Sequence, residues 1–143
     1  MKLVSKFALL ITVLAILYLL ISGNLLSSSP LVIAAQLLAV ALGIWARRSF
    51  QAGQFSIHAE PEEGTLISTG PYQYIRHPMY AFALLLIWSG ILGHLSTFNV
   101  VIGLIVTAVA SIRMVTEEQF LQERYPDYAA YARKTKRIIP SII

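Results

Sequence analysis

Residues 7–46 read FALLITVLAILYLLISGNLLSSSPLVIAAQLLAVALGIWA, residues 78–112 read PMYAFALLLIWSGILGHLSTFNVVIGLIVTAVASI, and neither stretch contains Asp, Glu, Lys or Arg. A helix needs about 20 apolar residues to cross the hydrocarbon core of a bilayer, within a range of roughly 17–25. The first stretch therefore has room for two crossings, and the second is too long for one. Together they predict an all-α, polytopic membrane protein with about four transmembrane helices.

The composition of the whole chain agrees with this expectation. Of its 143 residues, 57% are hydrophobic and only 13% are charged, with a mean hydropathy of +0.69. A soluble domain is about a quarter charged, and a domain this small cannot bury so much apolar surface. Because the chain has no cysteine, disulfide scaffolds, cysteine nucleophiles and cysteine-based zinc sites are excluded. No repeat or second domain is visible, so we expect a single domain over residues 1–143.

Polar breaks divide each apolar stretch into two helices. Gly23-Asn24 and the run Ser27–Pro30 interrupt the first stretch, and residues 93–97 interrupt the second. Asn99 is a candidate N-cap for the helix that returns after the second break. Short helices are also expected at the membrane interface. The expected spans are residues 5–23, 30–47, 78–94 and 98–115.

All charged residues lie on one side of the membrane if the chain has four spans. They fall before the first span, between the second and third, or after the fourth, while the two opposite turns carry none. The positive-inside rule then predicts cytoplasmic termini and a cytoplasmic middle loop, most simply in the inner membrane of a cell. A signal peptide is the alternative for the first segment, but its apolar run is long and no small-residue cleavage site follows it.

The groups that could perform chemistry lie at the cytoplasmic ends of the spans. The spans hold no acid or base at mid-depth, which disfavours a transporter, because transporters place ionisable groups inside the membrane. Thr69-Gly70-Pro71 is typical of a helix start, and Pro78 suits the first turn of the third span. Arg76 and His77 then lie at a helix N-terminus, which attracts an anion. The alternative is that Arg76 is a juxtamembrane anchor and His77 a cap.

The segment after the fourth span contains a second polar group. Arg113 and Glu117 are four residues apart, on one face of the helix if the span continues. They form either a surface ion pair or a pair that holds the anion and the cation of one ligand. Pro126 ends this helix and starts another. We interpret the next side chains as packing residues (Tyr125, Tyr128 and Tyr131) and as contacts to anionic lipids (Arg133, Lys134, Lys136 and Arg137).

Motifs of metal enzymes, hydrolases and nucleotide-binding proteins are absent. His58, His77 and His94 do not form a ligand set, because His94 belongs to an opposite turn and no HExxH pattern occurs. GxSxG, P-loop and GxGxxG patterns are missing as well. We therefore expect no metal site.

Four short elements occur in a characteristic order. They are Gly70-Pro71-Tyr72, Arg76-His77-Pro78-Met79-Tyr80, Glu117-Glu118-x-x-Leu121 and Tyr125-x-x-Tyr128-x-x-Tyr131, and the chain closes with Arg137-Ile-Ile-Pro140. Together they resemble the integral-membrane isoprenylcysteine carboxyl methyltransferase family and its phospholipid N-methyltransferase relatives. The resemblance covers residues 64–140. Each element is weak alone, but the order and spacing are specific.

This resemblance implies a methyltransferase that uses S-adenosyl-L-methionine as methyl donor and binds it without a Rossmann fold. By position, Arg113 matches the arginine that faces the methyl acceptor in the family. The resemblance also implies a set of donor-binding residues. These are Thr65, Leu66, Ile67, Tyr72, His77, Pro78, Met79, Tyr80 and Glu117. Arg76 joins the donor-binding set because it lies at the N-terminus of the third span.

Two positions depart from the family pattern. Phe82 stands where relatives commonly have glycine, which predicts an acceptor tunnel that is narrower or differently shaped. Gly64 stands where members that modify prenylated proteins often have histidine. The prenylcysteine substrate of those members is therefore not carried over to this chain. We expect a lipophilic acceptor that enters from the bilayer, either a prenylcysteine-like carboxylate or a lipid amine or thiol, with membrane lipids as further partners and no nucleic acid. A non-catalytic membrane subunit on the same scaffold is the alternative, and a four-span transporter is less favoured.

Overall fold

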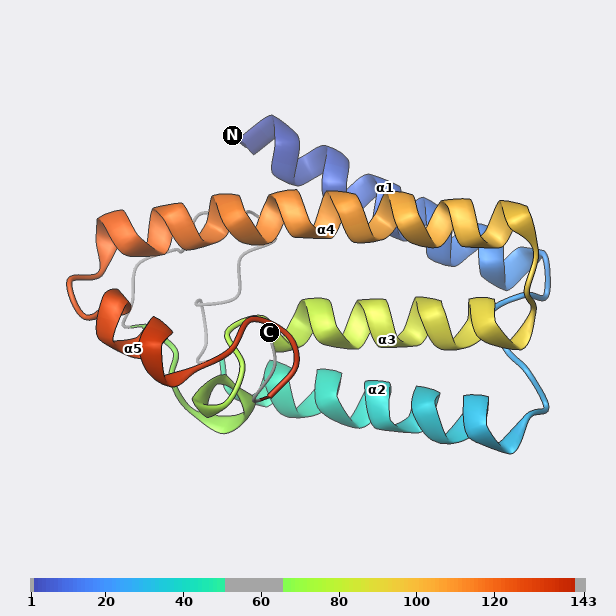
Figure 1. The fold of residues 1–143 in the computed structure, drawn as a ribbon, viewed down its shortest axis with the longest axis horizontal. Helices are drawn as coiled ribbons and strands as arrows, with labels where there is room; N and C mark the ends of the chain where they lie inside the picture. Colours follow the sequence, from blue (N-terminus) through green and yellow to red (C-terminus); the bar gives the residue numbers. More distant parts are fainter. Residues whose placement is uncertain (1, 51–65, 141–143) are drawn as a thin grey trace.

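The chain folds as a bundle of apolar helices (Figure 1). The computed structural model describes residues 2–50 and 66–140. Within these ranges the fold is all-helical, so the all-α part of the predicted fold class is confirmed for the residues that the structure describes. The elements are α1 (Lys2–Ile21), α2 (Pro30–Arg48), the 3-10 helix η1 (Gly70–Gln73), α3 (Pro78–Gly93), α4 (Thr97–Arg124) and α5 (Tyr128–Lys134).

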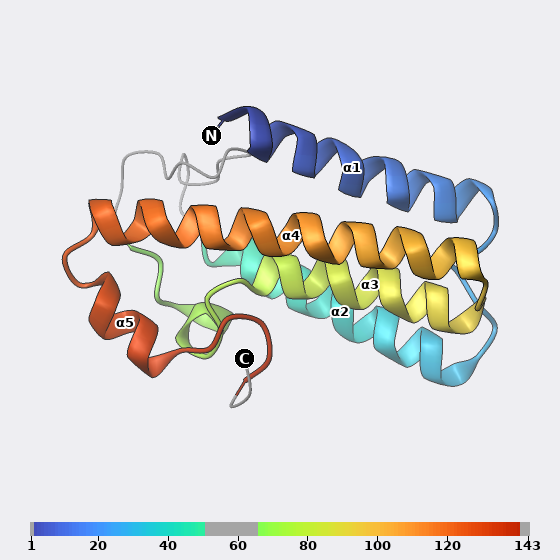
Figure 2. The same ribbon diagram turned by 45° about the horizontal axis from the view of Figure 1, so that its top comes forward.

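The four long helices form where the apolar pattern predicts them. α3 packs between α2 and α4, and α1 packs on α4 (Figure 2). By length and composition, α2 and α4 are able to cross a membrane, whereas α3 and the portion of α1 from Lys6 are shorter apolar helices. A fold with four membrane crossings therefore stays a prediction.

The outer surface of the bundle is strongly apolar. Large aliphatic side chains stand exposed on the outside of the helices, among them Ile21, Leu31 and Leu37. A soluble monomer rarely exposes such a continuous apolar surface, which is typical of a protein surrounded by lipid. The interior is held by a small cluster of buried residues: Ala15, Leu19, Leu25, Ile87, Ile91 and Val106.

α4 differs from the expected fourth span at both ends. Its N-cap is Ser96, not Asn99: the Ser96 hydroxyl oxygen accepts a hydrogen bond from the backbone N–H of Asn99 (3.1 Å). The buried Asn99 side chain instead donates to the carbonyl of His94 (2.7 Å). At the other end the helix continues to Arg124, because no breaker occurs before Pro126 and polar residues can extend a helix beyond the apolar segment.

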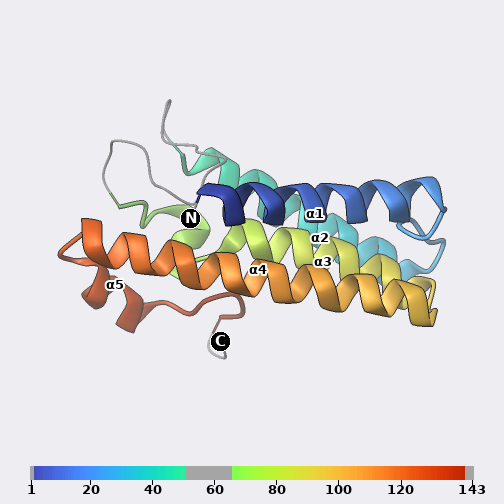
Figure 3. The ribbon, with the colours of Figure 1, turned by 90° about the horizontal axis from the view of Figure 1, so that it is seen from above.

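The bundle has two chemically different ends (Figures 1 and 3). The turns between α1 and α2 and between α3 and α4 lie at one end, and residues 22–29 and 94–96 contain no charged side chain. We call this the turn end. At the other end, η1 and the C-terminal segment, by which we mean residues 128–137 including α5, gather beside the last turns of α4. We call this the polar end, and the candidate site lies there.

Candidate functional site

The polar end is organised around the first turn of α3. Pro78 occupies the first turn of this helix and His77 is its N-cap residue, as the sequence predicts. The segment before the helix pairs with the C-terminal segment: Arg76 N donates to the Lys136 carbonyl (2.7 Å), and His77 N donates to the Arg137 carbonyl (2.9 Å). The N–H groups of the first helical turn have no partner inside a helix. An open helix N-terminus therefore lies beside the C-terminal segment.

η1 rests on the end of α2. Gly70 begins η1 with a φ of +59°, a left-handed conformation that glycine adopts without strain. A Cβ at this position would collide with the hydroxyl of Ser49. The Phe50 ring meets the Tyr72 ring edge-on, with 5.7 Å between centroids. The helix start predicted at Thr69–Pro71 is confirmed, and it produces one short 3-10 turn that carries Tyr72 into the polar end.

Glu118 of α4 accepts hydrogen bonds from three side chains. Arg76 Nε donates to Glu118 Oε1 (2.9 Å), and His77 Nε2 lies 3.2 Å from the same oxygen. Arg137 Nη2 donates to Glu118 Oε2 (2.8 Å), and these bonds raise the pKa of Arg137. Because a carboxylate only accepts, His77 carries its hydrogen on Nε2. Glu118 is only 7% exposed, and two guanidinium groups compensate its buried charge.

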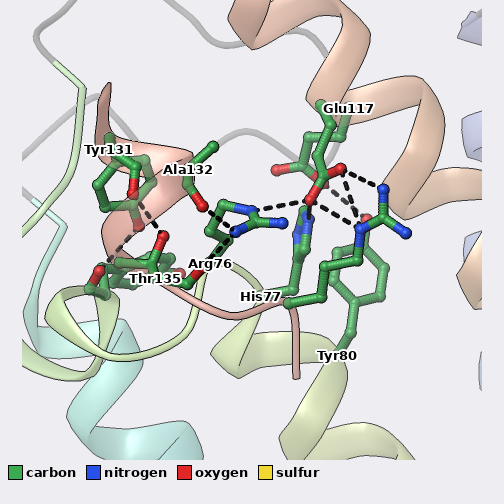
Figure 4. Close-up of polar contacts among 10 residues, drawn as sticks. Arg76, His77, Tyr80, Glu117, Tyr131, Ala132 and Thr135 are labelled. Atoms are coloured by element: carbon green, nitrogen blue, oxygen red, sulfur yellow. Dashed lines mark hydrogen bonds and ion pairs between the residues drawn. The ribbon is translucent and has the colours of Figure 1, made fainter. Parts of the chain in front are cut away.

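Arg76 extends this network to α5 and the residues after it (Figure 4). Its Nη1 donates to the carbonyl of Ala132 (3.0 Å) and to the carbonyl of Thr135. Arg76 thus links the segment before α3, helix α4 and the C-terminal segment. Its expected contact with a methyl donor stays a prediction.

Glu117, the neighbouring residue on α4, binds a different group. The Tyr80 hydroxyl donates to Glu117 Oε2 (2.9 Å). The guanidinium carbon of Arg113 lies 5.8 Å from the centroid of the Tyr80 ring, and the His77 ring meets that ring edge-on at 5.5 Å. Two elements, α3 and α4, therefore bring these four predicted site residues together around Tyr80.

Tyr72 reaches the same place from η1. Burial raises the pKa of its hydroxyl above the ordinary value, and the nearby negative charge of Glu117 raises it further. The Tyr72 carbonyl accepts a hydrogen bond from the Tyr131 hydroxyl (2.8 Å), and burial raises the pKa of Tyr131 to about 12. Tyr131 thus ties α5 to η1, in agreement with its interpretation as a packing residue.

The hydroxyl of Tyr128 on α5 has an unexpected environment. The residue is 1% exposed, yet its hydroxyl has no hydrogen-bond partner among the described residues. Burial and then the charge of Glu118 raise the pKa of this hydroxyl, while the charge of Arg76 lowers it, so the group lies near the Glu118 network. A buried polar group without a partner costs about 1–3 kcal/mol. Tyr128 packs as predicted, and its hydroxyl is a buried hydrogen-bond donor without a partner among the described residues.

The remaining predicted donor-binding residues make no polar side-chain contact that defines a role. Leu66 and Ile67 are half-buried in the segment before η1. Pro78 is buried in the first turn of α3, and Met79 beside it is half-buried. Thr65 lies outside the described residues.

The role of Glu118 was missed by the sequence interpretation, which named this residue as part of a motif but assigned a binding role only to the preceding Glu117. A signal for it exists, because small and apolar residues recur at helical spacing along the buried face of α4 and lead to Glu118. This face consists of Asn99, Gly103, Val106, Ala110, Met114 and Glu118.

Two other expectations need comment. Arg137, one of the residues expected to contact anionic lipids, binds Glu118, because a buried carboxylate requires a cation. Since 47% of its side chain remains exposed, lipid contact by Arg137 stays a prediction. Lipid contact by the exposed Arg133, Lys134 and Lys136 stays a prediction. Phe82 packs over Gly43 of α2, where a Cβ would lie 3.0 Å from its ring, so it fills the interface between α2 and α3.

Comparison with known proteins adds independent information. The family described as phospholipid methyltransferase matches residues 26–128 of the chain. A similar protein is the cobalt-zinc-cadmium resistance protein CzcN of Cupriavidus metallidurans, 35% identical over 89 residues. This match covers 57% of the chain and only 38% of that relative. No solved structure matches the chain.

Proposed function

The chain belongs to the phospholipid methyltransferase family, and we propose that it transfers a methyl group from S-adenosylmethionine to a lipophilic acceptor at the cytoplasmic face of a membrane. The observation that carries this proposal is the arrangement of Arg113, Glu117 and His77 around Tyr80 at the polar end. A cation, an anion and a helix N-terminus meet there, next to an apolar helix surface that lipid can reach.

The residues present fit such a donor. When bound, S-adenosylmethionine supplies a methyl group activated by a positively charged sulfur, and it carries an amine and a carboxylate. Glu117 is the carboxylate suited to a positive group, and the N-terminus of α3 suits a negative one. The buried Tyr128 hydroxyl, which has no partner among the residues that the structure describes, would give the polar end one more hydrogen-bond donor for a ligand.

We assign donor binding to the residues that the resemblance implies. The acidic and aromatic contacts come from Glu117, Tyr72 and Tyr80, and the N-terminus of α3 contributes His77, Pro78 and Met79. Leu66, Ile67 and Thr65 complete the set in the segment before η1. Arg76 acts by positioning, because its hydrogen bonds hold Glu118 and the C-terminal segment. The proposal treats residues 1–143 as one domain.

The role of Arg113 depends on the acceptor. A carboxylate acceptor needs no general base, and Arg113 would hold it in line with the donor and keep it anionic. The new O–C bond then forms as the C–S bond of the donor breaks. An amine or thiol acceptor has to lose a proton, which Glu117 or the Nδ1 atom of His77 would take.

Calorimetric titration of the purified protein in detergent with S-adenosylmethionine tests donor binding. We expect binding by the wild type and weaker binding, by about tenfold or more, for Glu117→Gln, because a charged hydrogen bond contributes about 1.5–3 kcal/mol. Glu123→Gln is the matched control, since this exposed residue lies further along the same helix. Equal affinities of the three proteins would remove Glu117 from the site. No binding up to millimolar donor would favour a non-catalytic subunit.

The acceptor and the membrane topology are tested separately. Incubation with labelled donor and a lipid extract is expected to yield one labelled lipophilic product, whose identity names the acceptor class. The proposed topology places both termini and the polar end in the cytoplasm. A C-terminal tag that protease removes from the outside of intact cells would contradict it.

A further inference from the structure

Glu118 joins parts of the chain that are far apart in sequence. It lies on α4, Arg76 and His77 precede α3, and Arg137 follows α5. Arg137 also directs its Nε to Glu118 Oε2 (3.1 Å), so its guanidinium group binds the carboxylate through two nitrogens. Such a paired arrangement fixes geometry as well as charge.

The C-terminal segment (residues 128–137) directly contacts the proposed donor-binding residues. Its Tyr131 hydroxyl donates to the Tyr72 carbonyl (2.8 Å). Its backbone accepts hydrogen bonds from the N–H groups of Arg76 and His77 at Lys136 and Arg137. The segment therefore lies against the N-terminus of α3 and also contacts η1.

Glu117 and Glu118 are neighbours on α4 that bind different partners. Successive residues of an α-helix are about 100° apart, so α4 cannot present both carboxylates to one partner. Arg76 and Arg137 bind Glu118 in the same rotation of α4 in which Glu117 meets Tyr80, so these contacts favour that alignment. Loss of the anchor would release both the C-terminal segment and this alignment.

We propose that Glu118 is a positioning residue that docks the C-terminal segment through Arg137 and thereby assembles the methyl-donor site. Docking of the segment and binding of the donor then stabilise each other, as linkage requires of two coupled equilibria. This inference rests on the proposed function for the identity of the ligand, while the docking contact itself does not.

A single cysteine can report on docking, because the chain contains none. Thr135 is 4% exposed and lies between α5 and the Arg137 anchor. In a Thr135→Cys background, a water-soluble maleimide is expected to react slowly, and more slowly still with S-adenosylmethionine present. Arg137→Gln is expected to raise the labelling rate by about tenfold or more and to weaken donor binding by a similar factor.

Two further variants separate positioning from general destabilisation. Lys136→Gln removes the neighbouring, exposed charge, and we expect it to leave both the labelling rate and the donor affinity within about twofold of the parent. Arg137→Lys keeps the charge without the paired geometry, and we expect intermediate values for both. Melting temperatures of all variants in detergent identify any that fail to fold.

Each outcome decides the proposal. Faster labelling of Arg137→Gln with unchanged donor affinity would mean that the Glu118–Arg137 contact holds the segment without affecting the donor site. This result would overturn the proposal. An unchanged labelling rate would overturn the docking role of Glu118. Slow labelling in the parent, fast labelling in Arg137→Gln and no donor binding by any variant would refute the proposed function, and the coupling to a donor with it, while supporting the docking contact alone.

Discussion

The two ends of the helical bundle are closed by different kinds of bonds. At the turn end, two side-chain amides and a histidine ring bind backbone carbonyls: Asn99 Nδ2 donates to His94 (2.7 Å), His94 Nε2 to Leu26 (2.7 Å) and Gln36 Nε2 to Leu25 (2.6 Å). At the polar end, the buried carboxylate of Glu118 is held by two arginines and a histidine.

This difference indicates at which end of the bundle charged groups that can bind a ligand are located. Hydrogen bonds from such side chains to backbone carbonyls close a turn at a low desolvation cost. They place no carboxylate or guanidinium group there that could bind a charged ligand. Buried ion pairs contribute little net stability compared with apolar packing. Their concentration at one end is therefore better explained by the positioning of a site than by the stability of the fold. Substitutions at the two ends should separate these contributions.

The largest effect is expected from Arg113→Lys at the polar end. If the acceptor is a carboxylate, lysine cannot reproduce the paired hydrogen bonds of the guanidinium group. Turnover should then fall by about tenfold to hundredfold, the equivalent of about 1.5–3 kcal/mol, with donor affinity within about threefold of the wild type. The measurements are one rate and one calorimetric titration, with an unchanged melting temperature as the folding control.

Two other results with Arg113→Lys would be informative. If both quantities barely change, Arg113 only supplies a positive charge beside Glu117, which lysine retains. If donor binding collapses together with turnover, Arg113 belongs to the donor site and its assignment to the acceptor is wrong.

An intermediate effect, on stability alone, is expected from Gly90→Ala at the turn end. A Cβ at Gly90 would lie 2.7 Å from the Leu25 carbonyl oxygen and 3.0 Å from Leu25 Cα, both backbone atoms that cannot rotate away. We expect a loss of about 1–3 kcal/mol, as for other overpacked sites. Thermal melting in detergent measures it, and donor affinity of the folded fraction should not change.

Gly43→Ala is the matched control in a neighbouring apolar helix. A Cβ there would meet only the Phe82 ring at 3.0 Å, and a side chain can shift. Alanine also gains about 1 kcal/mol of helix propensity over glycine, which offsets the shift. Equal destabilisation by the two substitutions would mean that the close approach at Gly90 does not limit stability.

The smallest effect is expected from Tyr128→Phe. Removing a buried hydroxyl that has no partner among the described residues should leave the melting temperature unchanged or slightly higher without donor. If the hydroxyl binds the donor, affinity should fall by about two- to tenfold, because a neutral hydrogen bond contributes about 0.5–1.5 kcal/mol. Tyr74→Phe, at an exposed tyrosine, is the control. Unchanged affinity in both variants would exclude Tyr128 from donor binding.

Much of the fold could be predicted from the sequence because hydrophobicity and helix breakers act locally. The charge-free stretches and their Gly, Asn, Ser and Pro breaks indicated four helices close to where they lie. The N-cap of α4 was misplaced at Asn99, because asparagine is a good cap in isolation and only the folded turn shows its side chain bound to His94. The same locality explains why η1 and the start of α3 at Pro78 were predicted correctly.

The amino-acid sequence was enough to identify the family and the division into charged and uncharged segments, and to predict a candidate site around Arg76–Tyr80, Arg113 and Glu117. The folded arrangement was needed to show which of the two adjacent carboxylates is buried, and that the half-exposed Arg137 binds Glu118. The physical reason is that pairing across α4, the segment before α3 and the C-terminal segment depends on helix rotation and packing. Periodicity constrains that rotation within one helix, but it does not specify which distant side chains meet there.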